Sequence, residues 1–141
     1  MTREQRFPNT STFHFYNANP KGKFVDDCVV RAIATATGKT WDDVFCDLCE
    51  LAKKYKGMPN DKKVYGKYLK MLGWVKHPQP RRDNGLKFTG CEFCKELAES
   101  GKRYIAHIGG RHIVAIVDGK VNDIWNSTAG CIGNYWTKEG R

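Results

Sequence analysis

The sequence predicts an α+β fold in which helices come first and an antiparallel sheet follows. As far as residue 101, apolar residues recur mainly at the three- and four-residue spacing of helices that bury one face. From residue 102 onward the pattern changes to short apolar runs typical of strands. Asp118-Gly119 joins two of these runs, and this dipeptide is a strong signal for a two-residue hairpin turn.

The 141 residues are expected to form one domain, residues 1–141, with enough chain to bury a core. Residues 1–25 are predicted to be an irregular arm, with one short strand over residues 12–16. Residues 27–101 are predicted to be mainly helical, and residues 102–137 to form the antiparallel sheet.

Each of four predicted helices has a start signal, and three have a stop signal. Asp, Thr and Asn favour the position before a helix, and glycine favours the position after it. Thr89 and Glu92 have the spacing of a capping box. The predicted helices run from Asp27 to Gly38, from Thr40 through Tyr55, from Asn60 to Gly73 and from Thr89 to Gly101.

The strands are predicted over residues 104–108, 112–117, 120–125 and 132–136. If Asp118-Gly119 alone forms the loop, counting back places His112 and Asp123 on the same sheet face as diagonal neighbours. Such neighbours have Cα atoms about 7–8 Å apart, within reach of longer side chains. A three-residue loop would instead oppose His112 with Asn126, so Asn126 is the reserve candidate for orienting the imidazole.

Cys28 is the candidate nucleophile because it lies where the arm gives way to the first helix. The partial positive charge of a helix N-terminus stabilises a thiolate, and a nearby imidazolium adds to this effect. Asp26 and Asp27 act in the opposite direction if they point at the sulfur. Taken alone, Cys28 is better explained as a small buried core residue. Its combination with a strand histidine and an acid favours catalysis.

These residues carry a resemblance to a known family. A cysteine at a helix start, a histidine on a strand and an acid two positions before a tryptophan (Asp123-Ile124-Trp125) resemble the papain-like cysteine peptidases. Residues 27–34, 63–65 and 112–120 are more closely similar to small papain-like or C39-like proteins of bacteriophages and prophages. The resemblance covers residues 14–127. It implies a papain-like fold, with the nucleophile in a helical N-terminal half packed on the C-terminal sheet.

The resemblance also implies roles for the three residues. Cys28 would attack a carbonyl, His112 would protonate the leaving group, and Asp123 would orient the ring. The function expected is a cysteine hydrolase, a peptidase or amidase that cleaves an amide or isopeptide bond in a host or phage protein. Acyl transfer of the transglutaminase type on the same triad is an alternative. So is a non-catalytic basic module that binds nucleic acid or a host protein.

One feature of the papain-like pattern is missing. A glutamine usually stands about six residues before the nucleophile and supplies the oxyanion hole, but here that position is Gly22. Asn17 and Asn19 are the candidates for the missing amide donor, together with the backbone N–H of Cys28.

Two CxxC pairs suggest zinc, because paired thiolates at short spacing chelate this ion. Both pairs fall in helical patterns, and a long stretch separates them, so buried free thiols are the favoured interpretation and no cofactor is expected. The pairs are Cys46 with Cys49 and Cys91 with Cys94.

The net charge of +9 is concentrated in residues 53–87, which hold eleven lysines and arginines against two acids. This stretch predicts either contact with nucleic acid or an acidic protein, or simply a well-solvated face. Its candidate surface residues are Lys53, Lys54, Lys56, Lys62, Lys63, Arg81 and Arg82.

The expected compartment is the cytoplasm, that of the bacterial host if the protein is phage-encoded. The first residues lack the apolar stretch of a signal peptide, and no apolar run is long enough to span a membrane. The expected partner is a protein or peptide substrate, with acidic substrates as candidates, and no membrane association is expected. The sequence contains no clear signal for an oligomeric state.

Overall fold

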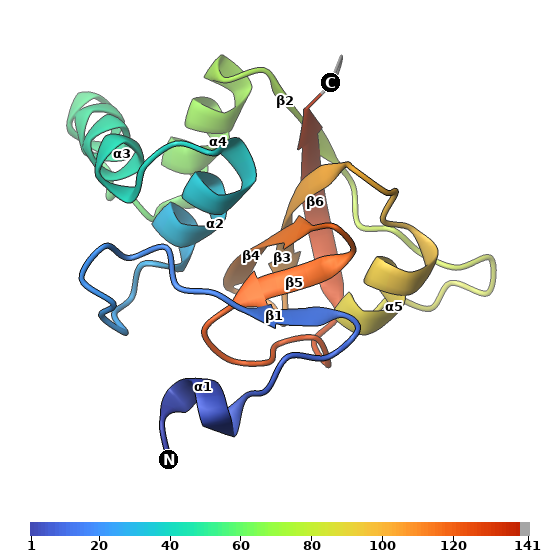
Figure 1. Cartoon of the computed structure of the whole chain (residues 1–141). Helices are drawn as coiled ribbons and strands as arrows, with labels where there is room; N and C mark the ends of the chain where they lie inside the picture. Colours follow the sequence, from blue (N-terminus) through green and yellow to red (C-terminus); the bar gives the residue numbers. More distant parts are fainter. Residues whose placement is uncertain (139–141) are drawn as a thin grey trace.

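The computed structural model, described here for residues 1–138, is a six-stranded sheet with helices on both faces (Figure 1). The strands are β1 (Phe13–Phe15), β2 (Trp74–His77), β3 (Arg103–Ile108), β4 (His112–Val117), β5 (Lys120–Asp123) and β6 (Ile132–Lys138). Their order in the sheet is β1-β5-β4-β3-β6-β2, and every neighbouring pair is antiparallel except β1 with β5. The predicted α+β class is therefore confirmed.

The helices are α1 (Arg3–Arg6), α2 (Cys28–Thr37), α3 (Trp41–Tyr55), α4 (Lys62–Met71) and α5 (Gly90–Glu96). The capping box of Thr89 is present, and Thr40 caps α3 as predicted. Two boundaries differ: Asp61 rather than Asn60 precedes α4, and α5 ends at Glu96 rather than near Gly101. Within the described part of the chain, no helix has the length and apolar character needed to cross a bilayer.

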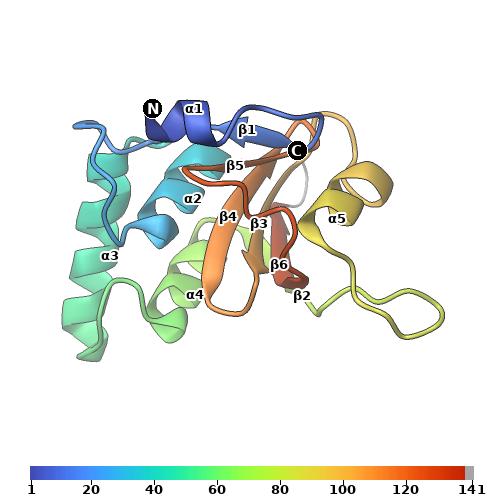
Figure 2. The same ribbon diagram turned by 90° about the horizontal axis from the view of Figure 1, so that it is seen from below.

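The sheet separates two apolar layers, because successive strand side chains point to opposite faces. On one face α2, α3 and α4 pack against residues that include Ile105, Ile113 and Trp136. On the other face α5 inserts Phe93 among residues that include Tyr104 and Ile116. Figure 2 shows the three longer helices and α5 on opposite sides of the strands.

The start of α2 differs in one respect from the prediction. Asp27 occupies the N-cap position, but its side chain makes no capping hydrogen bond. Its carboxylate instead accepts hydrogen bonds from other side chains of the candidate site. Gly38 ends the helix as predicted, with a φ of 80° that suits glycine.

The β4–β5 hairpin has the predicted two-residue turn. Asp118 and Gly119 both have positive φ, 53° and 69°, which a type I′ turn requires. Val117 pairs with Lys120, which is the register on which the predicted position of Asp123 depends. The strand β5 itself ends at Asp123 rather than at Trp125.

The N-terminal arm is more ordered than predicted. It contains the short helix α1 and the expected strand β1, which pairs in parallel with β5 and places Phe15 beside Asp123. The backbone N–H of Tyr16 donates to the Asp123 carbonyl over 3.0 Å. The arm therefore covers the outer edge of the strand that carries the candidate acid.

Candidate active site

Cys28 is the first residue of α2 and is half-buried. Its N–H is thus one of the four that a helix leaves without an internal partner. The sulfur lies within hydrogen-bonding reach of the His112 side chain. Because the Nε2 atom of His112 contacts Asp123, the Nδ1 atom is left to face the sulfur. The helix start and the first residue of β4 therefore meet as the sequence predicts.

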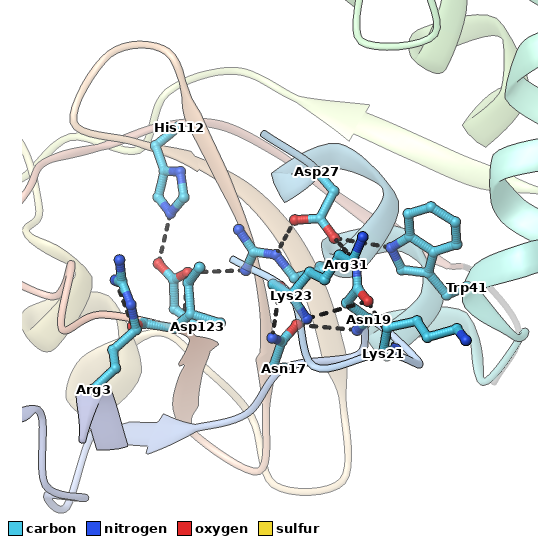
Figure 3. Close-up of polar contacts among 11 residues, drawn as sticks. Arg3, Asn17, Asn19, Lys21, Lys23, Asp27, Arg31, Trp41, His112 and Asp123 are labelled. Atoms are coloured by element: carbon cyan, nitrogen blue, oxygen red, sulfur yellow. Dashed lines mark hydrogen bonds and ion pairs between the residues drawn. The ribbon is translucent and has the colours of Figure 1, made fainter. Parts of the chain in front are cut away.

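The imidazole of His112 and the carboxylate of Asp123 are in direct contact. The His112 Nε2–H donates to Asp123 Oδ2 over 2.6 Å (Figure 3). Burial lowers the pKa of His112, but hydrogen bonds and charges of Asp123 and Cys28 outweigh it and raise the pKa to about 9. At neutral pH the ring is accordingly an imidazolium beside the Asp123 carboxylate.

Asp123 is fully buried, and its carboxylate receives four hydrogen bonds. Besides His112, the donors are Ser127 Oγ at 2.8 Å, the backbone N–H of Ile124 at 2.8 Å and Arg31 Nη1 at 3.2 Å. Burial raises the pKa of this carboxyl, but the hydrogen bond and charge of His112, with the bonds from Ser127 and Ile124, lower it overall. Asp123 is therefore ionised and held in one orientation.

Arg31 is a member of the site that the sequence analysis missed. It is 6% exposed and joins two carboxylates: Nε donates to Asp27 over 2.7 Å and Nη1 to Asp123 over 3.2 Å. Asp27 also accepts hydrogen bonds from Trp41 Nε1 and Asn19 Nδ2 (Figure 3). A charged residue inside the apolar run of residues 29–34 is the signal that could have identified it.

An open pocket of about 500 Å³ lies beside the sulfur. Its lining includes Cys28, Tyr65 and His107, with residues 60–62 and the hairpin glycine Gly110. The Tyr65 hydroxyl and His107 Nε2 are 2.6 Å apart, and His107 Nδ1 lies 2.8 Å from Asn134 Oδ1. A second polar chain, from Tyr65 through His107 to Asn134, therefore borders the pocket.

The ionisation of this second chain differs from that of His112. Burial, with the charges of Lys62 and Lys76, lowers the pKa of His107 despite the hydrogen bond to Asn134. Burial and the nearby Cys28 raise the pKa of Tyr65 to about 12. His107 is thus neutral and Tyr65 is a protonated hydroxyl, and neither competes with Cys28 for a proton at neutral pH.

The predicted oxyanion donors Asn17 and Asn19 are not directed at the sulfur. The side-chain amide of Asn17 donates to the Lys23 carbonyl, and that of Asn19 donates to Asp27. Their side-chain oxygens accept backbone N–H groups of the same loop. Both residues shape the loop before α2, because short amides stabilise turns in this way. The reserve residue Asn126 likewise bonds to Thr128 and leaves the orienting position to Asp123.

The two CxxC pairs are not brought together. Cys46 and Cys49 lie on α3, whereas Cys91 and Cys94 lie on α5 across the sheet (Figure 1). Among residues 1–138, no group of three or more metal-ligating side chains is positioned to hold an ion.

The predicted basic surface divides into separate parts. Lys53 and Lys54 are in the last turn of α3, and Lys56 follows it directly. Arg81 and Arg82 lie in the loop after β2. Arg81 donates a hydrogen bond within that loop, and Arg82 makes a bidentate contact with Glu96. Lys62 and Lys63 begin α4 and line a groove that is considered below.

No protein-family model, curated protein sequence or solved structure matches the chain, so the papain-like resemblance remains a prediction from its motifs.

Proposed function

We propose that this protein is a cysteine hydrolase that cleaves an amide or isopeptide bond with Cys28, His112 and Asp123. The observation that supports this most directly is one imidazole that is hydrogen-bonded to a buried carboxylate and interacts with the Cys28 sulfur, which lines a pocket. The raised pKa of His112 favours the ion pair needed for nucleophilic attack.

Acylation follows from this arrangement. The Cys28 thiolate attacks the carbonyl carbon and forms a C–S bond, while the carbonyl oxygen becomes an oxyanion. The His112 imidazolium then gives its Nδ1 proton to the leaving nitrogen, and the C–N bond breaks to leave a thioester. Asp123 keeps the ring in the orientation and tautomer that this transfer requires.

Deacylation reverses the proton transfer. Neutral His112 removes a proton from water as the water oxygen attacks the thioester carbon. The C–S bond breaks, the carboxylic product leaves, and the imidazolium–thiolate pair is restored. An amine in place of water would give acyl transfer, so product analysis separates the two reactions.

The oxyanion needs donors, and Asn17 and Asn19 do not supply them. The free N–H of Cys28 at the start of α2 is one donor, and we assign the second to the Tyr65 hydroxyl at the pocket wall. Among residues 1–138, Asn134 Nδ2 is buried without a hydrogen-bond partner. If the Asn134 amide turns over, it donates to His107 Nδ1, and His107 Nε2–H then donates to Tyr65. The hydroxyl hydrogen of Tyr65 becomes available to the substrate oxygen.

Selective alkylation tests the proposal. At about pH 6 an ordinary thiol, with a pKa near 8.5, is less than about 1% ionised. Iodoacetamide should therefore modify half-buried Cys28 before the exposed Cys46 and Cys131, and peptide mass mapping identifies the labelled residue. His112→Ala should slow the labelling of Cys28 by at least about tenfold at this pH.

The rates of Cys46 and Cys131 in the same sample are the internal control, because neither touches His112. Labelling of all exposed thiols ahead of Cys28, or an unchanged Cys28 rate in His112→Ala, would contradict the proposal. A complementary experiment is the intact mass after reaction with an electrophilic acyl or ubiquitin-like probe. The expected adduct forms with the wild type and is absent in Cys28→Ala.

A further inference from the structure

A groove with a volume of about 650 Å³ runs between α4 and β2. Five exposed lysines line it, and among residues 1–138 none of the five makes an ion pair. Glycines, Trp74, Val75 and Trp136 complete the lining. The lysines are Lys62, Lys63, Lys67, Lys70 and Lys76.

This groove adjoins the candidate active site through a shared lining residue. Lys62 lines both the groove and the pocket beside Cys28. Lys62 and Lys76 both act electrostatically on His107, which lies in the wall of that pocket. A chain whose scissile bond lies at Cys28 can therefore extend past Lys62 and along α4.

The strand β2 provides an open edge to this groove. It is the last strand of the described sheet and pairs with β6 on one side only. Trp74, Val75 and Lys76 are consecutive, yet all three line the groove. Side chains on one sheet face would alternate, so the groove follows the edge of the strand rather than its face. Free N–H and C=O groups at such an edge can pair with an extended peptide.

We propose that the groove binds an extended acidic segment of the polypeptide substrate. This inference rests on the proposed hydrolase function and adds a substrate class to it. Five uncompensated cations favour carboxylates, and the edge of β2 favours a peptide backbone. Nucleic acid fits less well, because the groove tryptophans are buried, with 6% of Trp74 and 3% of Trp136 exposed, and offer no open ring for base stacking.

Binding to the full-length Cys28→Ala protein tests the proposal without requiring turnover. The probe is a fluorescent peptide of about ten residues that alternates Asp or Glu with apolar residues, the period of an extended strand. Its control replaces each acid with Asn or Gln. Fluorescence anisotropy should show binding of the acidic peptide at least about tenfold tighter than that of its amide control.

Lys63→Glu/Lys70→Glu reverses two exposed charges in the groove and should weaken binding of the acidic peptide by about tenfold. Lys87→Glu/Lys95→Glu makes the same change of net charge outside the groove and should leave the affinity within about twofold. Thermal unfolding of both variants confirms that they are folded. N-methylation of alternate backbone amides in the peptide should also weaken binding, because it blocks pairing with β2.

Equal losses in the two double variants would overturn the proposal by showing a general charge effect. So would equal binding of the acidic and amide peptides, or a single-stranded oligonucleotide that displaces the peptide at lower concentration. The alkylation of Cys28 at about pH 6 is unaffected by these outcomes. Failure of the groove proposal is thereby distinguished from failure of the proposed hydrolase.

Discussion

At the residue scale, the candidate site is a buried row of alternating charges. Asp27, Arg31, Asp123 and His112 follow one another through contacts of 2.7, 3.2 and 2.6 Å. Each carboxylate has a cation beside it, so the burial of each charge is compensated. The ion pairs that hold α2 against β5 thereby also hold Asp123 in the position from which it orients the imidazole.

Arg31→Met should be strongly destabilising because it leaves Asp27 and Asp123 without their shared cation. Loss of one partner from a buried ion pair costs about 3–5 kcal/mol of unfolding free energy. Arg31→Lys should recover only part of this loss, since a lysine ammonium lacks the two-pronged geometry that reaches both carboxylates. Urea denaturation measures both values, and a loss below about 1 kcal/mol for Arg31→Met would contradict this role.

The stability contributed by His112 and Asp123 should depend on pH. The pKa of His112 is raised from its ordinary 6.5 to about 9, so its contribution is complete below about pH 6.5 and lost as pH rises through about 9. The pKa of Asp123 is lowered from its ordinary 3.8, so its contribution is complete above that value and lost at lower pH.

Wild type and His112→Gln should therefore differ most in unfolding free energy between about pH 4 and pH 6.5, and converge toward pH 10. Urea denaturation at a series of pH values measures the unfolding free energy of both proteins. Taking the difference at each pH removes the pH effects that the two proteins share. A difference that stays constant from pH 6 to pH 10 would show that the folded state does not favour the imidazolium.

The proximity of His112 and Asp123 could be predicted from sequence, but the surroundings of the candidate residues could not. The contact of His112 with Asp123 followed from counting residues around a two-residue turn, because strand geometry is regular. The contact of Arg31 with Asp123 joins a helix to a strand, and no local rule fixes such a distance. Likewise, the position of Tyr65 depends on how α4 packs against α2 and the sheet.

At the element scale, the β4–β5 turn controls the site through its length. One glycine inserted between Asp118 and Gly119 keeps an Asp-Gly dipeptide for the two-residue turn, so that Val117 would face Gly119 in place of Lys120 and the strand register would shift by one residue. A shift by one turns Asp123 to the other face and sets Ile124 opposite His112. Cys28 alkylation at about pH 6 should then fall by at least about tenfold, toward the rate of His112→Ala.

A matched control for this insertion is a glycine added after Gly85, in the exposed loop that follows β2. It should leave the Cys28 rate unchanged, because that loop carries no residue of the candidate site. Circular dichroism establishes that both proteins keep their secondary structure. An unchanged Cys28 rate in the turn insertion would mean that a bulge absorbs the extra residue and that the turn does not set the register.

Elements with strong local signals were predicted well, and those that depend on long-range pairing were not. The Thr40 cap, the Thr89 capping box and the Asp118-Gly119 turn each act within a few residues. The strand β2 was missed because its pairing with β6 joins residues 74–77 to residues 135–138, and four residues carry no clear period. The one-turn helix α1 was missed because it buries no residue and has no apolar face.

At the scale of the whole molecule, the sheet determines which side chains can come together in one site. Cys28 is far in sequence from His112 and Asp123, yet the three meet where the start of α2 approaches the β4–β5 hairpin. The lysine groove begins beside them at Lys62. The CxxC pairs show the opposite outcome, since similar sequence spacing leaves them on opposite sides of the same sheet.

This separation leads to a prediction about metal removal. One zinc ion requires four ligands at about 2.0–2.3 Å, and α3 and α5 cannot approach each other across the sheet. Incubation with EDTA, followed by buffer exchange, should therefore leave the melting temperature and the Cys28 alkylation rate unchanged. Cys46→Ser/Cys49→Ser should behave in the same way, because Cys46 is exposed and Cys49 only half-buried. A fall of several degrees after chelation, reversed by added zinc, would show that these thiols hold a structural ion.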